Sequence, residues 1–399
     1  MKKILITSSI IILIIGASLV TLFYFRTPLM MYFYGEKKFP VLVVSGTWKE
    51  MGYQIGSNKK FAQGIHRLAS FLKRPFPPEK AKDYFNKAKK FMSASIIEQM
   101  QGLAEGESKA MGISYKEAWD DVLIWNFFIP STYINGCTAF AVTTGNSSFI
   151  AHNTDLEYLY SLGGTLIIFK PNEGLGYPFF SFFQPGFVGT SLGENLNGLA
   201  FVFNAAYPSG RDFGIPPEIF LRKVIQESGS LEEAIAQFQN FIKNGGRFAH
   251  NGSILTFMDF KEKKMARVEV APDRIEVTYG TTDGDKTYTL ATNHYLSMPE
   301  RNKRKDFNTS SYARYERCEM LIRMTKIFNV ENIFKILTDH DGKEMGTDYT
   351  ICRHKNLNIG TNNSIIIDDK FTFYYIIGNP CRYLKDSSLL QTVRWKEML

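Results

Sequence analysis

The sequence predicts an α+β fold, and three observations indicate this class. A helical pattern comes first, short β-rich runs follow, and helices and strands then alternate in blocks, as in proteins whose helices pack on sheet layers. The 399 residues are 44% hydrophobic and 14% aromatic, which is enough to bury a sizeable core. Neither a repeat nor a linker divides residues 41–399, so we expect one large domain there.

The first 25 residues are predicted to be a transmembrane signal anchor. Lys2 and Lys3 precede an uncharged run from Ile4 to Phe25, which as a helix is long enough to span a bilayer of roughly 30 Å. Basic residues before such a run favour an N-terminus inside, with the rest of the chain outside the cytoplasm. Cleavage near Gly16-Ala17-Ser18 would instead release a secreted protein, but apolar residues continue beyond that point and favour retention.

Residues 26–40 are predicted to form a stalk before the folded domain. A short strand is expected at Val41–Val44. From about Pro78 to Trp125, apolar residues recur at spacings of three and four, which predicts helices, with Gly112 as a stop signal.

After Asn135-Gly136 the pattern changes to short β-rich runs bounded by Gly, Asn and Pro. A hairpin turning at Gly145-Asn146 would bring the polar residues 151–158 back beside Cys137. The predicted strands are Thr138–Val142, Phe149–Ala151, Thr165–Phe169, Phe179–Phe183 and Leu199–Phe203.

Two helices are predicted next, one opening near Pro216-Pro217 and one from Ser230 to Gly245-Gly246. Ser230 with Glu233 three residues later is typical of a capping box. The remaining predicted elements are strands at Ile254–Phe260, Ala266–Val270, Ile275–Tyr279 and Thr287–Ala291, helices at Ala313–Phe328 and Val330–Thr338, and strands at Ser364–Ile367 and Phe371–Ile377.

Cys137, at the junction between the helical part and the first of these runs, is the most suggestive residue for chemistry. A lone cysteine is often a small buried hydrophobe, whereas a cysteine nucleophile needs a base and oxyanion donors. The histidines show no typical Cys–His–Asn pattern, and neighbours within Cys352-Arg353-His354 would point to opposite faces of a strand. If the bond after Gly136 were cut, the new α-amine of Cys137 would itself be a base, with an ordinary pKa of about 7.7–8.0.

A series of short motifs stands in order along residues 40–382: Gly46–Gly56, Gly112–Ser114, Asp121–Asn126, Gly136–Thr138, His152–Tyr158, Gly198–Asn204, Ala291–His294, Ser311–Arg314, Ile351–Arg353 and Gly378–Pro380. Together they resemble the choloylglycine hydrolase superfamily of N-terminal nucleophile hydrolases. Within it, the chain is most similar to the acyl-CoA:6-aminopenicillanic acid acyltransferase family.

The resemblance implies an αββα four-layer sandwich and a precursor that cuts itself before Cys137. An α-chain part, residues 41–136, and a catalytic β-chain part, residues 137–399, would result. In chemical terms, Cys137 attacks the carbonyl of Gly136, and water then releases the thioester. Gly136 suits the tight turn that this attack requires because it has no Cβ.

The resemblance also implies site roles. Cys137 supplies the thiolate and the α-amine, and Asp155 holds that amine. Asn293 donates to the oxyanion, Asn204 contacts the oxyanion or the amine, and Arg353 supports the region of the nucleophile. Each residue also has an ordinary structural use, as a turn cap, a strand end or a surface arginine.

His152 and Asn153 are predicted to bind substrate. His152 stands where bile-salt hydrolases carry an arginine, and a histidine is able to be neutral where an arginine is not. This difference favours the acyltransferase branch over a bile-salt enzyme. Alternatively, His152 satisfies a hydrogen bond in the core.

Three functions are compatible with these features. The first is an exported N-terminal cysteine amidohydrolase or acyltransferase that cleaves linear amides through an acyl-cysteine, with water as the default acceptor. The second is a lipid or N-acyl amide or ester hydrolase resembling phospholipase B-like proteins or acid ceramidase. The third is a catalytically silent, membrane-anchored binding protein. Aromatic residues that could line an acyl pocket, or simply form core, include Tyr158, Tyr160, Phe179, Phe180, Phe182, Phe183 and Phe187.

Other partners are not expected. Much of the net charge of +8 comes from residues 301–326. The basic stretch Arg301–Lys305 has no interleaved aromatic residue for base stacking, so we expect no nucleic-acid binding. The sequence has no glycine-rich phosphate-binding loop of the usual spacing, so no cofactor is predicted. The six histidines lack paired ligand spacing, so no metal is predicted. Outside the cytoplasm, disulfides are feasible among Cys318, Cys352 and Cys381, and the oligomeric state is left open.

Overall fold

The computed structural model describes residues 39–132, 135–157, 164–208, 214–249, 252–302, 305–354 and 359–399. The predicted anchor and residues 26–38 of the predicted stalk lie outside these ranges. Within them, no helix has both the length and the apolar character needed to cross a membrane.

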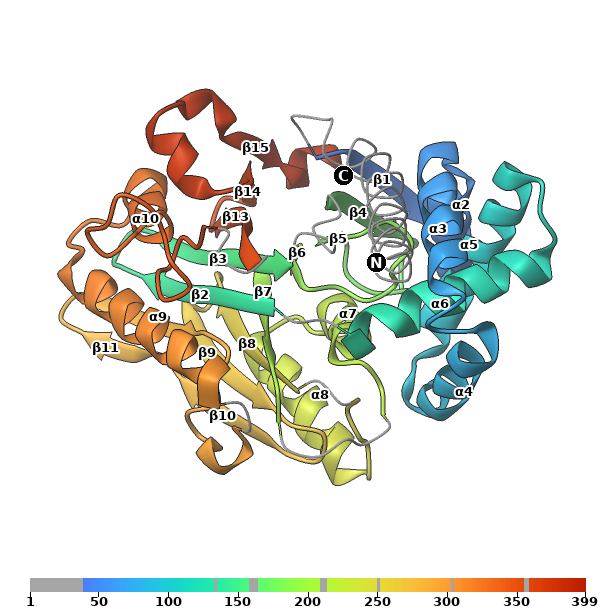
Figure 1. Cartoon of the computed structure of the whole chain (residues 1–399), viewed down its shortest axis with the longest axis horizontal. Coiled ribbons are helices and arrows are strands. Elements are labelled where there is room, and N and C mark those ends of the chain that lie inside the picture. Colours follow the sequence, from blue (N-terminus) through green and yellow to red (C-terminus); the bar gives the residue numbers. More distant parts are fainter. Residues whose placement is uncertain are drawn as a thin grey trace, which may run out of the picture.

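Two β-sheets form the centre of the molecule (Figure 1). The first sheet has eight strands in the order β1-β4-β5-β6-β7-β8-β9-β10, and the second has seven in the order β11-β12-β2-β3-β13-β14-β15. The first contains β1 (Val41–Gly46), β4 (Thr165–Pro171), β5 (Phe179–Phe183), β6 (Leu192–Asn195), β7 (Leu199–Ala206), β8 (Gly252–Asp259), β9 (Lys264–Val270) and β10 (Ile275–Tyr279). The second contains β2 (Asn135–Thr143), β3 (Ser148–Glu157), β11 (Thr281–Asp283), β12 (Lys286–Ala291), β13 (Ile359–Asp368), β14 (Thr372–Ile377) and β15 (Gln391–Arg394).

Helices cover the outer face of each sheet (Figure 1). Those on the first sheet are α2 (Trp48–Ser57), α3 (Lys59–Leu72), α4 (Pro78–Ala88), α5 (Ala94–Met111), α6 (Tyr115–Thr132), α7 (Pro217–Glu227) and α8 (Leu231–Lys243), and those on the second are α9 (Lys305–Met324) and α10 (Val330–Leu337). Short 3₁₀ turns are η1 (Lys89–Phe91), η3 (Pro299–Arg301), η4 (Pro380–Leu384), η5 (Ser387–Leu389) and η6 (Trp395–Met398).

Three apolar layers hold these elements together and confirm the four-layer αββα arrangement. One lies between α2–α8 and the first sheet, one between the sheets, and one between the second sheet and α9 and α10. In β2, Ala139 and Ala141 pack between the sheets, whereas Phe140 and Val142 pack toward the helices. Alternate side chains of a strand point to opposite faces, so both faces of β2 are buried.

Most predicted elements are confirmed, with some differences. Most of the Gly46–Gly56 block, for which no element is predicted, lies in α2, which begins at Trp48, and α3 follows it. The short strands β6, β11 and β15 are also missing from the prediction. Phe39, at the end of the predicted stalk, is buried between the sheets against Phe182 and Tyr375, so this position belongs to the folded domain.

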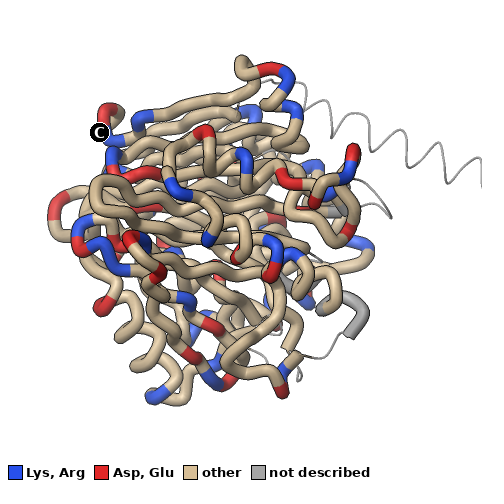
Figure 2. Tube along the Cα trace, turned by 90° about the vertical axis from the view of Figure 1, so that its left-hand side faces the viewer, with Lys and Arg blue, Asp and Glu red and all other residues tan. Residues whose placement is uncertain are grey.

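Charged residues of both signs are interspersed over the described chain. Figure 2 shows Lys and Arg alternating with Asp and Glu on the side that carries α9 and α10. Two basic residues of α9 are ion-paired: Arg317 with Asp339, and Arg323 with Glu319. This pairing is that of a solvated protein face rather than a uniformly basic surface.

Candidate active site

The predicted hairpin is confirmed and brings Cys137 beside the polar cluster. Strands β2 and β3 pair antiparallel around a turn at residues 144–147, with Cys137 opposite Thr154 and Gly136 opposite Asp155. The prediction ended β3 at Ala151, but the strand continues to Glu157, so the polar cluster lies on the strand itself. Alternation therefore divides the cluster between two faces.

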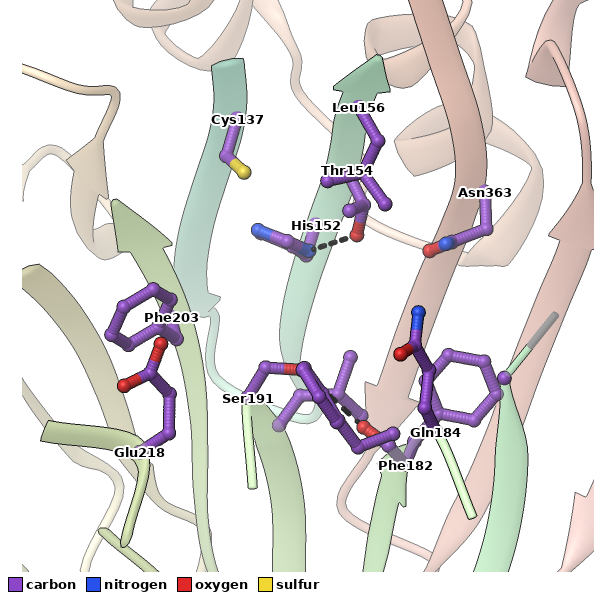
Figure 3. Close-up of a pocket in the computed structure, with 13 residues that line it drawn as sticks. Cys137, His152, Thr154, Leu156, Phe182, Gln184, Ser191, Phe203, Glu218 and Asn363 are labelled. Atoms are coloured by element: carbon purple, nitrogen blue, oxygen red, sulfur yellow. Dashed lines mark hydrogen bonds between the residues drawn. The ribbon is translucent and has the colours of Figure 1, made fainter. Parts of the chain in front are cut away.

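Cys137, His152 and Thr154 share the face that looks toward the first sheet, where they line a cavity of about 60 Å³ (Figure 3). Cys137 and His152 project into it from neighbouring strands, and Glu218 lies at its opposite edge. The remaining lining residues are mostly apolar or aromatic: Leu156, Gly164, Phe182, Phe183, Gln184, Ser191, Leu192, Phe203 and Asn363. Tyr158 and Tyr160 lie outside the described residues.

Asn293, just after β12, contacts the backbone of Cys137. Its Oδ1 accepts a hydrogen bond from the Cys137 N–H at 2.8 Å, and its Nδ2 donates to the carbonyl of Ala205 on β7 at 2.9 Å. In the uncut chain the amide of Asn293 therefore holds the nitrogen that cleavage would turn into the α-amine. This geometry supports a contact with the amine rather than the predicted donation to an oxyanion.

Asn204, on β7, makes the reciprocal contact between the sheets. Its Nδ2 donates to the carbonyl of Ala291 on β12 at 3.1 Å, and its side chain also interacts with His152, where it opposes the lowering of the imidazole pKa by burial. Asn204 on β7 and Asn293 just after β12 thus tie the two sheets together beside Cys137.

Arg314, on α9, is central to the site, although the sequence motif that contains it indicated no role. Its guanidinium donates to the Cys137 carbonyl, to Thr138 Oγ1 at 3.0 Å and to Asn293 Oδ1 at 2.8 Å. One turn earlier, Ser311 Oγ accepts from the Asn293 N–H at 2.7 Å. Residues three apart share a helix face, so α9 fixes both Cys137 and Asn293.

Asp155 and Arg353 lie on the opposite face of the hairpin from the cavity. Arg353 Nη1 is 3.5 Å from Asp155 Oδ2, and Thr361 Oγ1 donates to Asp155 Oδ1 at 2.7 Å. A Cβ added to Gly136 would lie 2.2 Å from Arg353 Nη1 and 3.1 Å from Asp155 Oδ2. A larger residue at position 136 would therefore displace one or both side chains of this ion pair.

Burial dominates the protonation of the central groups. It raises the pKa of the Cys137 thiol to about 12, with a smaller contribution from the Asp155 carboxylate. It lowers the pKa of His152 to about 3, so this imidazole is neutral at ordinary pH. Burial also raises the pKa of Asp155, although Arg353 and Arg314 oppose the shift. In the uncut chain the thiol is protonated and needs a base.

Glu218, at the start of α7, is a second polar group of the cavity that the sequence did not reveal. Its Oε2 is buried without a hydrogen-bond partner, and burial raises its pKa to about 7. A carboxyl group in this position is able to accept a hydrogen bond from a donor group of a bound molecule.

Asn153 does not line the cavity. Its Nδ2 donates to the carbonyls of Leu337 and Ile351, and its Oδ1 accepts from Ser364. It faces the helical layer, as alternation with its neighbours requires. We assign it a structural role in place of the predicted contact with substrate, whereas His152 does line the cavity.

Comparisons with known proteins give one family. Residues 142–379 match the model of the family described as "Acyl-coenzyme A:6-aminopenicillanic acid acyl-transferase". The predicted residues His152, Asp155, Asn204, Asn293 and Arg353 lie inside this segment, and Gly136 and Cys137 lie just before it. Among curated proteins, none matches the sequence.

Solved structures resemble the chain at a low level. An N-acylethanolamine-hydrolyzing acid amidase ortholog of Caenorhabditis elegans is 16% identical with a TM-score of 0.41, covering 58% of this chain and 92% of that one. Two forms of a conjugated bile acid hydrolase from Clostridium perfringens also have TM-scores of 0.41. The first form, a mutant, is 14% identical, and the match covers 64% of this chain and 92% of that one. The second form, a variant, is 15% identical, and the match covers 65% of this chain and 93% of that one.

Proposed function

The chain belongs to the acyl-coenzyme A:6-aminopenicillanic acid acyl-transferase family, and we propose that Cys137 carries its acyl chemistry after the chain cuts itself at Gly136. The protein is a hydrolase or acyltransferase of the N-terminal cysteine type. The single observation that best supports Cys137 is its placement: its side chain lines the cavity while its backbone N–H is held by Asn293.

In the proposed self-cleavage, Cys137 Sγ attacks the carbonyl carbon of Gly136. The bond between Gly136 and the Cys137 nitrogen breaks, this nitrogen takes up a proton, and a thioester forms. Water then hydrolyses the thioester, leaving a Gly136 carboxylate, a free thiol and a new α-amine. Asn293 Oδ1 already accepts a hydrogen bond from this nitrogen in the uncut chain, which supports a site that positions the α-amine before cleavage releases it.

In the proposed turnover, the α-amine takes the thiol proton and the thiolate attacks a linear amide of the substrate. The amine of the substrate leaves with a proton from the α-ammonium group, and the acyl group stays on Cys137 as a thioester. Water, or another amine, then takes the acyl group and restores the thiol. The positive charge of Arg314 lowers the pKa of the Cys137 thiol, in opposition to the larger effect of burial.

We infer a small-molecule substrate with an apolar acyl part. Phe182, Phe183 and Phe203 supply aromatic surface along the cavity, while Glu218 and Gln184 supply polar groups. Such a lining suits an apolar chain joined to a polar amide.

We also propose that residues 1–25 anchor the enzyme with its catalytic part outside the cytoplasm. The charge pattern of Lys2, Lys3 and the uncharged run Ile4–Phe25 supports this orientation. Protease added to intact cells should degrade the catalytic part. A catalytic part that is digested only after lysis would contradict the proposal.

Replacement of the nucleophile tests the proposed function. Cys137→Ala should abolish both self-cleavage and amide turnover, whereas Cys318→Ala, at another buried cysteine, should preserve both. In the unmodified enzyme, mass spectrometry after brief exposure to an N-acyl amide should find the acyl group on Cys137. Turnover that survives in the Cys137→Ala variant would refute the assignment.

A further inference from the structure

Four metal-ligating side chains converge at a place outside the Cys137 cavity. His340, Cys352, His354 and Cys381 each present one donor atom, and these atoms all lie within 4.8 Å of one another. Cys352 is buried and the other three are half-buried. None of the four lines the cavity, so the proposed function leaves this cluster unexplained.

The donor atoms have the spacing of a small coordination sphere. The Nε2 atoms of His340 and His354 are 3.1 Å apart, and Cys381 Sγ is 3.3 Å from His354 Nε2. The two imidazole planes stand at 83° to each other. Tetrahedral zinc, with Zn–N of about 2.0–2.1 Å and Zn–S of about 2.3 Å, requires donor separations of roughly 3.3–3.8 Å. Adjustments of a few tenths of an ångström bring these two measured pairs to that geometry.

The fold brings these donors together from three segments. His340 follows the end of α10, Cys352 and His354 lie in the segment before β13, and Cys381 lies in η4. The backbone N–H of Cys352 donates to the carbonyl of Asp339 at 3.1 Å, which ties the first two segments together.

A glycine permits the close packing of the cluster. A Cβ added to Gly346 would lie 1.9 Å from the Cys352 carbonyl oxygen and 2.8 Å from His354 Cδ2. Any larger residue at position 346 would therefore push the chain away from two of the four donors.

We propose that His340, Cys352, His354 and Cys381 bind one zinc ion in a closed structural site. Two sulfur and two imidazole donors are typical of zinc, and four protein ligands leave no open position for catalysis. Binding would release the two thiol protons to solvent.

The site would also hold the residue between two of its ligands. Arg353 lies between Cys352 and His354 in sequence, and its guanidinium reaches Asp348 at 2.9 Å and Asp155 at 3.5 Å. An ion at the cluster would thus anchor the segment that carries Arg353 to α10 and η4. The zinc site does not depend on Cys137 being the nucleophile.

Metal analysis of the full-length protein, purified without chelators from zinc-supplied cells, tests the proposal. Elemental mass spectrometry should find about one zinc per chain, and X-ray absorption at the zinc edge should find two sulfur and two nitrogen neighbours. Cys381→Ser should lose most of the zinc. Cys318→Ser, at a buried cysteine outside the cluster, should keep it.

Three results would overturn the proposal. They are a protein without zinc, a Cys352–Cys381 disulfide found by peptide mapping under non-reducing conditions, and a zinc ion whose neighbours contain no sulfur. The absorption spectrum is recorded on the unmodified protein, so it decides the matter even if the Cys381→Ser variant does not fold.

Discussion

At the scale of single residues, Gly136 and Cys137 occupy opposite faces of β2, so the peptide bond between them joins two environments. The Cys137 side chain faces the cavity, whereas the α-carbon of Gly136 lies under the Arg353–Asp155 ion pair. A small change at position 136 therefore acts on the ion pair and on the bond that is proposed to break.

Gly136→Ala should slow self-cleavage by about 100-fold, because the added Cβ displaces Arg353 or the backbone, and shifts of about 1 Å cost that much in a positioned reaction. The fraction of cut chain over time on a denaturing gel measures the rate. Gly145→Ala is the matched control, since a Cβ there meets nothing within 4 Å. Equal cleavage rates in the two variants would refute the role of the close approach.

Glu218→Gln should change how stability depends on pH. Burial raises the pKa of Glu218 from 4.5 to about 7, so between these values the unfolded chain loses the proton while the folded chain keeps it. The folded protein consequently loses stability as the pH rises through this window. At about 1.4 kcal/mol per pKa unit, the variant should gain on the order of 3 kcal/mol over wild type by pH 7.

Urea unfolding at a series of pH values measures this difference. Below pH 4.5 the group is protonated in both states, so the shift itself contributes nothing there. Glu262→Gln, at an exposed glutamate, is the control and should follow wild type at every pH. A difference between Glu218→Gln and wild type that stays constant from pH 4.5 to 7 would contradict the assignment.

At the scale of elements, α2 and α5 approach each other through glycines. A Cβ on Gly52 would lie 2.1 Å from the Gln99 carbonyl oxygen, and one on Gly102 would lie 1.9 Å from the Lys49 carbonyl oxygen. The Gly46–Gly56 block therefore serves helix packing, which presses α2 and α5 together on the first sheet.

Gly102→Ala should destabilise the fold by about 2 kcal/mol or more, because overpacking of a tight contact typically costs 1–3 kcal/mol. The free energy of unfolding in urea measures the effect. Gly145→Ala again serves as the control and should change stability little. A loss of unfolding free energy no larger than that of the control would contradict this prediction, because it would show that α2 and α5 accommodate the added methyl group.

The hairpin and the family resemblance made much of the site predictable at this scale. Gly145-Asn146 fixed the turn, and the motifs indicated Cys137, Asp155 and Asn293, which the structure brings together. Thr361 was not predictable, because a bulge between Thr361 and Asn363 in β13 changes the alternation and turns its hydroxyl toward Asp155.

Residues that meet only through tertiary structure were not predictable from the sequence pattern. Arg314 reaches the Cys137 carbonyl from α9, and Glu218 reaches the cavity from the first turn of α7. The ligand cluster combines donors from three segments, so its spacing along the chain resembles no metal motif. The pairing of Asn204 with Ala291 requires the packing of two sheets, which the strand pattern alone does not position.

At the scale of the whole molecule, the two predicted parts of the chain share one core. Residues 41–136 supply β1, which pairs with β4, and helices that pack in the same apolar layer as α7 and α8. Cleavage after Gly136 would therefore leave two chains held by this common core, and they should separate only under denaturing conditions.

The identity of the first residue of the larger fragment tests the central claim most directly. The full-length protein is run on a denaturing gel after prolonged incubation, and any new N-terminus is sequenced. We predict a fragment that begins Cys137-Thr138-Ala139 in the wild type and is missing from Cys137→Ala. A wild-type chain that stays intact, or one cut at another bond, would contradict the proposal that Cys137 acts as an N-terminal nucleophile.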